Sequence, residues 1–71
     1  MRTDHSASPR EGDVVIAQEK GGTAYTIRAV PGIPQLSYAT YEDAVAAAAA
    51  WALRADVGLW FTDDDKTFAA M

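Results

Sequence analysis

Two segments near the start of the chain have hydrophobic patterns that predict β-strands, the first a run of β-branched residues and the second an alternation of apolar and polar residues. Residues 13–19 are rich in β-branched side chains and are followed by Lys20-Gly21-Gly22. A glycine pair accepts the positive φ angles that a tight hairpin turn requires. Residues 23–30 then place apolar and polar side chains on opposite faces. The two segments together predict a β-hairpin.

A third strand is expected over residues 33–39. The dipeptide Pro31-Gly32 before it suits a type II turn, in which the proline presets φ and the glycine accepts a positive φ. Pro34 has no amide hydrogen to give to a neighbouring strand, which predicts that this strand lies at the edge of a sheet. Three successive strands joined by short turns predict an antiparallel meander.

A helix is predicted to follow Thr40. The Thr40 side chain can accept the free amide of Asp43 as an N-cap, and Glu42 and Asp43 lie where the helix dipole favours negative charge. Residues 44–55 contain neither glycine nor proline and have high helix propensity. At about 100° per residue, one stripe of this helix is apolar and mostly small, so it can lie close to a sheet. The stripe expected to face the core consists of Tyr41, Ala44, Val45, Ala48, Trp51, Ala52 and Ala55.

The opposite stripe of the helix carries fewer charges than a solvent-facing helix usually does. It consists of Glu42, Asp43, Ala46, Ala50, Leu53 and Arg54. Two interpretations stay open, because isolated exposed apolar residues are normal. The first is a bias of composition toward alanine, and the second is a surface that is buried against a partner.

Residues 57–62 predict a fourth strand, 63–66 a polar turn, and 67–68 a short returning arm. The helix precedes the fourth strand and must therefore cross one face of the sheet. The predicted fold class is α+β, a small two-layer β-β-β-α-β arrangement in which an antiparallel meander carries one helix on one sheet face. We expect a single domain over residues 13–71. A disordered N-terminal tail is expected over residues 1–12, which have no large apolar side chain after the initial methionine.

The amino-acid composition excludes several classes of protein. The 71 residues include no cysteine and only 13 Leu, Ile, Val and Phe residues, whereas alanine supplies 15. This composition excludes a disulfide scaffold, a two-domain enzyme and a membrane span. The net charge is −4, and acids outnumber bases after the tail, so we expect no direct binding to nucleic acid and none to membranes. The start of the chain lacks an apolar signal segment, which predicts a cytoplasmic protein.

The residue types that carry most enzyme chemistry are scarce. The only histidine, His5, lies in the predicted tail, and without cysteine there is no thiolate nucleophile. The run Asp63-Asp64-Asp65 is the strongest candidate for a cation site, but a calcium loop spaces its ligands at alternate positions around a central glycine. The run therefore favours an Asp-rich hairpin turn, and whether it binds a cation stays open. We expect no catalytic site, no metal, no cofactor and no small-molecule substrate.

A binding surface is expected on the sheet face that points away from the helix. Alternation places six residues there, namely Val15, Ala17, Thr26, Arg28, Val30 and Trp60, of which Val15, Arg28, Val30 and Trp60 are the candidates for binding. Large aromatic side chains and arginine are types that protein interfaces favour. We expect these residues to bind a protein partner or a second copy of the chain. The alternative is that Trp60 packs under the C-terminal segment around Phe68, or only covers the sheet.

Residues 23–55 resemble small uncharacterised bacterial proteins of the YaiA type. The resemblance lies in Tyr25-Thr26-Ile27-Arg28, the Pro-Gly turn, and Thr40-Tyr41-Glu42-Asp43-Ala44 before an alanine-rich helix. Those proteins combine a short meander with a similar helix start. The same residues resemble, less closely, the partial double-stranded-RNA-binding-like domain of HicB-type antitoxins. The second resemblance implies an inhibitor that docks on a small ribonuclease toxin.

The sequence favours a small bacterial or phage protein that acts without catalysis, as a protein-binding or regulatory module or as a homodimer. An alternative is an acidic inhibitor of a nucleic-acid-binding enzyme, either antitoxin-like or a phage-borne protein that blocks host defence. Such an inhibitor needs carboxylates spread over one face to meet a basic groove. In this chain three acids cluster at one turn and two at a helix start.

Overall fold

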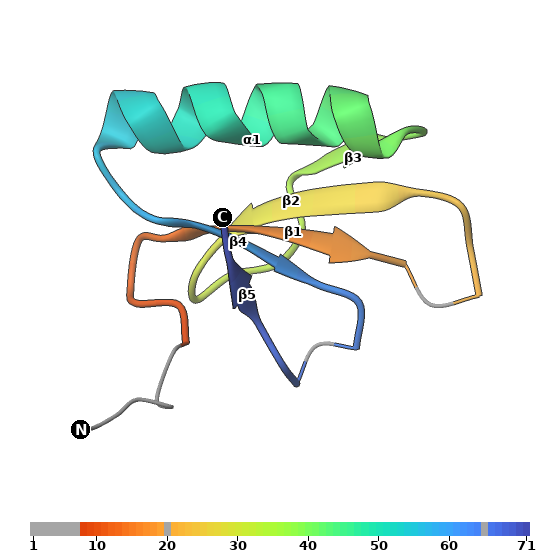
Figure 1. Cartoon of the computed structure of the whole chain (residues 1–71), viewed down its shortest axis with the longest axis horizontal. Helices are drawn as coiled ribbons and strands as arrows, with labels where there is room; N and C mark the ends of the chain where they lie inside the picture. The colour runs from red at the N-terminus through yellow and green to blue at the C-terminus, as the bar shows by residue number, and fades with distance from the viewer. Residues whose placement is uncertain (1–7, 20, 65) are drawn as a thin grey trace.

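Five strands form one mixed sheet, and one helix covers a face of it (Figure 1). This computed structural model describes residues 8–19, 21–64 and 66–71. The strands lie in the order β3-β2-β1-β4-β5. Their bounds are Val14–Gln18 for β1, Tyr25–Ala29 for β2, Leu36–Tyr38 for β3, Leu59–Thr62 for β4 and Ala69–Ala70 for β5, and helix α1 spans Tyr41–Ala55. The predicted α+β class, with one helix on one sheet face, is confirmed.

Strand β1 lies at the centre of the sheet. Ile16 lies opposite Ile27 of β2 in an antiparallel pair and beside Phe61 of β4 in a parallel pair. Val14, Val15 and Ile16 have no exposed surface. A strand that is buried on both faces has a continuous apolar sequence in place of an alternating one, which explains the run that begins β1.

Helix α1 begins and ends at capping residues. Thr40 accepts a hydrogen bond from the amide of Asp43 at 3.1 Å, so the predicted N-cap is confirmed. At the other end, Asp56 has a left-handed backbone conformation with φ of 58°. The amide of Val57 donates to the carbonyl of Ala52 at 3.0 Å, which closes the last turn. The chain then turns directly into β4.

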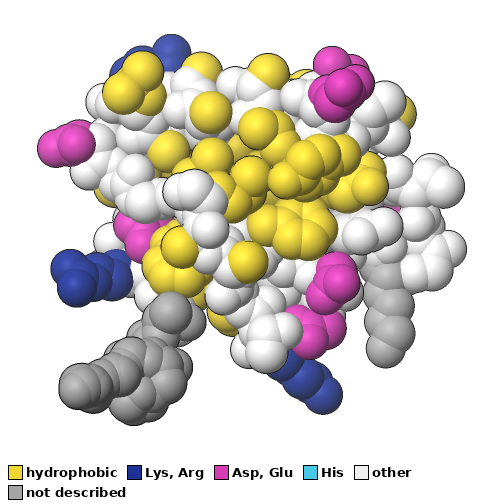
Figure 2. Space-filling view, viewed as in Figure 1, with side chains coloured by type: hydrophobic (Ala, Val, Ile, Leu, Met, Phe, Trp, Pro, Cys, Tyr) yellow, Lys and Arg dark blue, Asp and Glu magenta, His cyan; other side chains and the backbone are white. Residues whose placement is uncertain are grey.

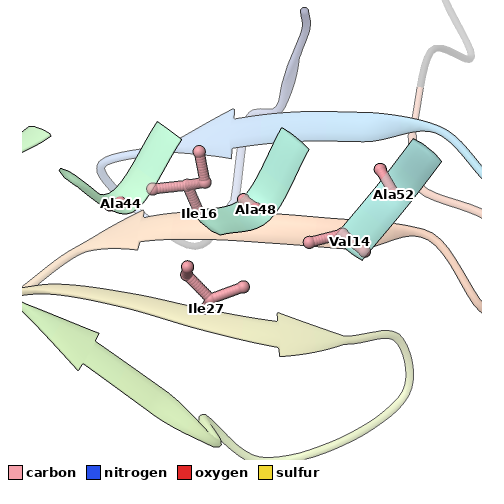
Figure 3. Packing of buried hydrophobic residues seen from close by; sticks show 6 residues of the cluster. All are labelled: Val14, Ile16, Ile27, Ala44, Ala48 and Ala52. Carbon is pink, nitrogen blue, oxygen red and sulfur yellow. The ribbon is translucent and has the colours of Figure 1, made fainter. Parts of the chain in front are cut away.

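The core lies between α1 and the sheet. Three alanines on the inner stripe of the helix pack against Val14 and Ile16 of β1 and Ile27 of β2 (Figure 3). These alanines are Ala44, Ala48 and Ala52, and all three are buried. Their small size lets the helix lie close to the strands, so most of the apolar bulk comes from the sheet.

Aromatic rings fill the space at the start of the helix. The ring of Tyr41 contacts Tyr25 of β2 and Phe61 of β4 edge to face, with centroid distances of 5.7 and 5.6 Å. Such edge-to-face pairs contribute beyond their buried area. Tyr41 therefore connects the helix start to strands on both sides of β1.

Two turns differ from the predicted ones. Of the glycine pair, only Gly21 has a positive φ, and the amide of Glu19 donates to the carbonyl of Ala24, so the hairpin turn is wider than two residues. Gly32 does not have the positive φ that a type II turn requires at its third residue, so the predicted type II turn is wrong. Glycine and proline mark the positions of turns, and the neighbouring strands decide their geometry.

The described segments nearest both ends of the chain form hydrogen bonds with the sheet or with residues next to it. Residues 1–7 of the predicted tail lie outside the described residues. Residues 10–12 form a turn, in which the amide of Gly12 donates to the carbonyl of Val30 at 2.6 Å. At the other end, the returning arm is β5 at residues 69–70, which pairs antiparallel with β4.

Candidate functional site

Three of the four predicted partner-binding residues form a row across the sheet. Val15 of β1 lies opposite Arg28 of β2 and beside Trp60 of β4, so the three side chains share the face away from α1. Arg28 and Trp60 are half-buried, whereas Val15 has no exposed surface. This burial corrects the expectation for Val15, because a side chain without exposed surface makes no direct contact with a partner.

The fourth residue, Val30, lies one position beyond β2 and is half-buried. Its amide donates to the carbonyl of Asp13, and its carbonyl accepts from Gly12. The backbone of Val30 therefore ties the N-terminal turn to the sheet. Partner binding by Arg28, Val30 and Trp60 stays a prediction.

The indole of Trp60 is held by Asp13, a buried carboxylate just before β1. Oδ2 of Asp13 accepts hydrogen bonds from Nε1 of Trp60 and from the amide of Arg10, both at 2.9 Å. Oδ1 accepts the amide of Gly58 at 3.0 Å. One side chain thus joins the N-terminal turn, the segment after α1 and the sheet face. Sequence reasoning missed Asp13, because two of its donors, on Gly58 and Trp60, reach it only through the pairing of β1 with β4.

These contacts lower the pKa of Asp13 below its ordinary value of 3.8. The amide of Arg10 has the largest effect, burial opposes it, and the donors on Gly58 and Trp60 lower the pKa further. Asp13 is therefore ionised at neutral pH, and each of its hydrogen bonds is charge-assisted.

A small hollow lies on the same sheet face as Arg28. Its volume is about 230 Å³, and its lining is mostly polar: Ala17, Gln18, Glu19, Thr26, Arg28, Pro34, Asp63 and Asp64. Because the lining carries both signs of charge, the hollow does not select a strongly charged ligand.

The Asp-rich run forms a turn whose central carboxylate is used by the turn itself. Oδ1 of Asp64 accepts the amides of Lys66 and Thr67, both at 2.8 Å, and Oδ2 accepts the hydroxyl of Thr67 at 2.8 Å. These donors hold the pKa of Asp64 well below its ordinary value. Asp65 lies outside the described residues, and among residues 8–19, 21–64 and 66–71 no group of three potential metal-ligating side chains occurs. Cation binding at the turn stays an open question.

An apolar groove runs between edge strand β3 and helix α1. Its volume is about 550 Å³. The groove is lined by Gln35, Leu36, Tyr38, Ala47, Ala50, Trp51 and Arg54. Leu36 is 43% exposed, although most of the other lining residues are apolar. Of the helix residues in the lining, Ala50 and Arg54 belong to the outer stripe expected from the sequence and Trp51 to the stripe expected to face the core. Their combination with β3 into a groove depends on sheet order.

Further apolar surface lies on the side of α1 that faces β4. Figure 2 shows apolar side chains gathered between the helix and the strands on that side, with acidic side chains over the beginning of the helix. Leu53, near the end of the helix, is 83% exposed. The helix therefore has apolar surface on both flanks, and the groove lies on the flank beside β3.

No helix in the described part of the chain is long and apolar enough to cross a membrane. The chain matches no protein-family model, no curated protein and no solved structure.

Proposed function

We propose that the chain is a non-catalytic protein-binding module whose binding surface is the groove between β3 and α1. The observation that carries this proposal is the groove itself, which gathers Leu36, Tyr38 and Trp51 around solvent-accessible space. Tyrosine, tryptophan and arginine dominate the energetics of protein interfaces, and Arg54 borders the same groove. A surface of this composition supports binding to protein more than binding to a polar metabolite.

The occupant of the groove is expected to contact side chains without extending the sheet. Strand β3 has only three residues and follows Pro34 closely. Short edge strands next to proline resist pairing with a further strand. An apolar helix that lies beside α1 fits such a groove better than an added strand does.

The sheet face with Arg28 and Trp60 is a second candidate surface. Its support is the contact between Asp13 and the indole of Trp60. An aromatic side chain that is already fixed loses little conformational entropy when a partner binds. The two candidate surfaces lie on opposite sides of the molecule and can be tested separately.

Two matched substitutions test the groove. Leu36 lines the groove and Ile33, which is 78% exposed, does not. We expect Leu36→Ser to weaken protein binding at least about tenfold, whereas Ile33→Ser removes a more exposed apolar side chain without effect. Binding is measured in two ways, by self-association in sedimentation experiments and by capture of other proteins from bacterial extract.

The third variant, Arg28→Ala, separates the two surfaces. Binding that depends on Arg28 and is insensitive to Leu36→Ser would move the site to the sheet face. A chain that binds neither itself nor another protein would overturn the proposed function.

A further inference from the structure

We infer that the groove is occupied by helix α1 of a second copy of this chain, packed antiparallel to the first. This inference rests on the proposed function, because it identifies the partner that the groove binds.

Four residues form one stripe along α1 on the side of the groove: Asp43, Ala47, Ala50 and Arg54. Successive spacings of four, three and four residues keep side chains on a single line of a helix. Ala47, Ala50 and Arg54 line the groove, and Asp43 lies about three turns before Arg54. The stripe therefore has an acid at its start, two small residues in its middle and a base at its end.

This order of charges is self-complementary in one direction only. A two-fold axis between residues 48 and 49 places Arg54 opposite Asp43 of the second copy, and Ala47 opposite Ala50. The symmetry repeats each contact, so both ends of the helix pair join an acid to a base. Parallel pairing would instead place like charges side by side. Among the described residues, neither Asp43 nor Arg54 has an ion-pair partner within its own chain.

Packing and helix dipoles favour the same arrangement. Two alanines that face each other let helix axes approach to about 8 Å. Antiparallel helices also bring the positive end of one dipole beside the negative end of the other. The same rotation brings both β3 edges to one side of the helix pair. Leu36, Tyr38 and Trp51, the large side chains of the groove, line it together with Ala47, Ala50 and Arg54 of this stripe.

The size of the contact predicts a weak dimer. A helix of 15 residues is about 22 Å long, so pairing covers only a strip of the 4633 Å² exposed by one chain. Interfaces below about 1,200 Å² in total are typical of weak and transient complexes. We expect a dissociation constant of the dimer in the micromolar range or above. We also expect this constant to rise at high salt, because salt screens the charge pairs.

A charge exchange tests the antiparallel pairing. Arg54→Asp places four acids at the interface, and Asp43→Arg places four bases there, so each single variant is expected to weaken self-association at least about tenfold. The double variant Asp43→Arg/Arg54→Asp restores complementary charges and is expected to restore the dimer. Glu42→Arg makes the same charge change in the same turn but off the stripe, and should leave association nearly unchanged.

A second pair of variants tests the centre of the stripe without altering the helix start. Ala50 and Ala49 are both exposed, and only Ala50 lies on the stripe and lines the groove. Ala50→Glu is expected to abolish self-association, whereas Ala49→Glu is expected to preserve it. Sedimentation equilibrium over a wide concentration range gives the dissociation constants, and circular dichroism verifies that each variant remains folded.

The outcomes separate this inference from the proposed function. A wild-type chain that stays monomeric, a double variant that does not recover, or equal effects of Ala49→Glu and Ala50→Glu would overturn helix self-pairing. If Leu36→Ser then still abolishes capture of another protein, the groove binds that protein and the proposed function stands. If Leu36→Ser changes no binding at all, both are overturned.

Discussion

At the scale of single residues, the side chain of Asp13 connects three separate parts of the molecule. Its carboxylate accepts one amide from the N-terminal turn, one amide from the segment after α1 and the indole of Trp60. A buried donor that loses its acceptor costs about 1–3 kcal/mol. Three donors depend on this single side chain, so stability should respond strongly to its charge.

The first prediction concerns acid stability. The unfolded chain protonates Asp13 near its ordinary pKa of 3.8, whereas the folded chain does so only at lower pH, because the pKa is lowered. The stability that Asp13 supplies is therefore fully present above pH 3.8 and is lost as pH falls through the folded pKa. We expect Asp13→Asn to lower the free energy of unfolding by about 1–3 kcal/mol at neutral pH and to reduce its decline below pH 3.8.

Urea unfolding at a series of pH values measures both effects. Glu11→Gln changes an exposed carboxyl in the same turn and serves as the control, with an expected change within about 0.5 kcal/mol. An Asn variant that is as acid-sensitive as the wild type would contradict the role of Asp13.

At the scale of elements, α1 is the part of the structure that local sequence specifies best. Thr40 has the side chain an N-cap requires, and the lack of Gly and Pro between residues 44 and 55 lets the helix continue to its end. The C-cap is less favourable, because Asp56 is an L-residue with a positive φ and its negative charge lies at the negative end of the dipole.

The second prediction follows from that cap. We expect Asp56→Gly to raise the free energy of unfolding by about 0.5–1 kcal/mol, because glycine adopts the left-handed conformation without strain. Asp56→Ala removes the same charge but keeps the strain, so it is expected to raise the free energy of unfolding less than Asp56→Gly does. Thermal unfolding of the two variants separates the effects. Equal shifts in the same direction would show that charge, not backbone conformation, controls this position.

At the scale of the whole molecule, the pairing of β1 with β4 completes the sheet. Val14 lies beside Leu59 in this parallel pair, and the amide of Val14 donates to the carbonyl of Gly58 at 2.9 Å. Gly58 is closely surrounded at this junction. A methyl group added there would lie 3.1 Å from Oδ2 of Asp13 and 3.2 Å from Nε1 of Trp60.

The third prediction tests how tightly this junction is packed. We expect Gly58→Ala to lower the free energy of unfolding by about 1–3 kcal/mol and to shift the indole NMR signal of Trp60. Gly22→Ala is the matched control, because its added methyl meets only the flexible side chain of Glu19. A change within about 0.5 kcal/mol is expected for the control. If both variants behave alike, the junction has room that the structure does not show.

The limits of prediction from sequence follow from the range of the interactions. The hairpin of β1 and β2, the edge position of β3 and the N-cap at Thr40 depend on neighbouring residues, and local pattern located them. The contact of Asp13 with Trp60 joins residues 47 positions apart. Burial of Val15 has the same origin, because its neighbours in β2 and β4 surround it. The groove was missed for this reason too.

The pairing of β1 with the later strand β4 also affects the state of β1 during synthesis. During synthesis the chain emerges from its N-terminus, so β1, β2, β3 and α1 leave the ribosome before β4 does. Until then, one side of β1 is an unpaired apolar edge, open to the wrong strand of another nascent chain. The most protected strand of the finished protein is therefore the most vulnerable one during translation.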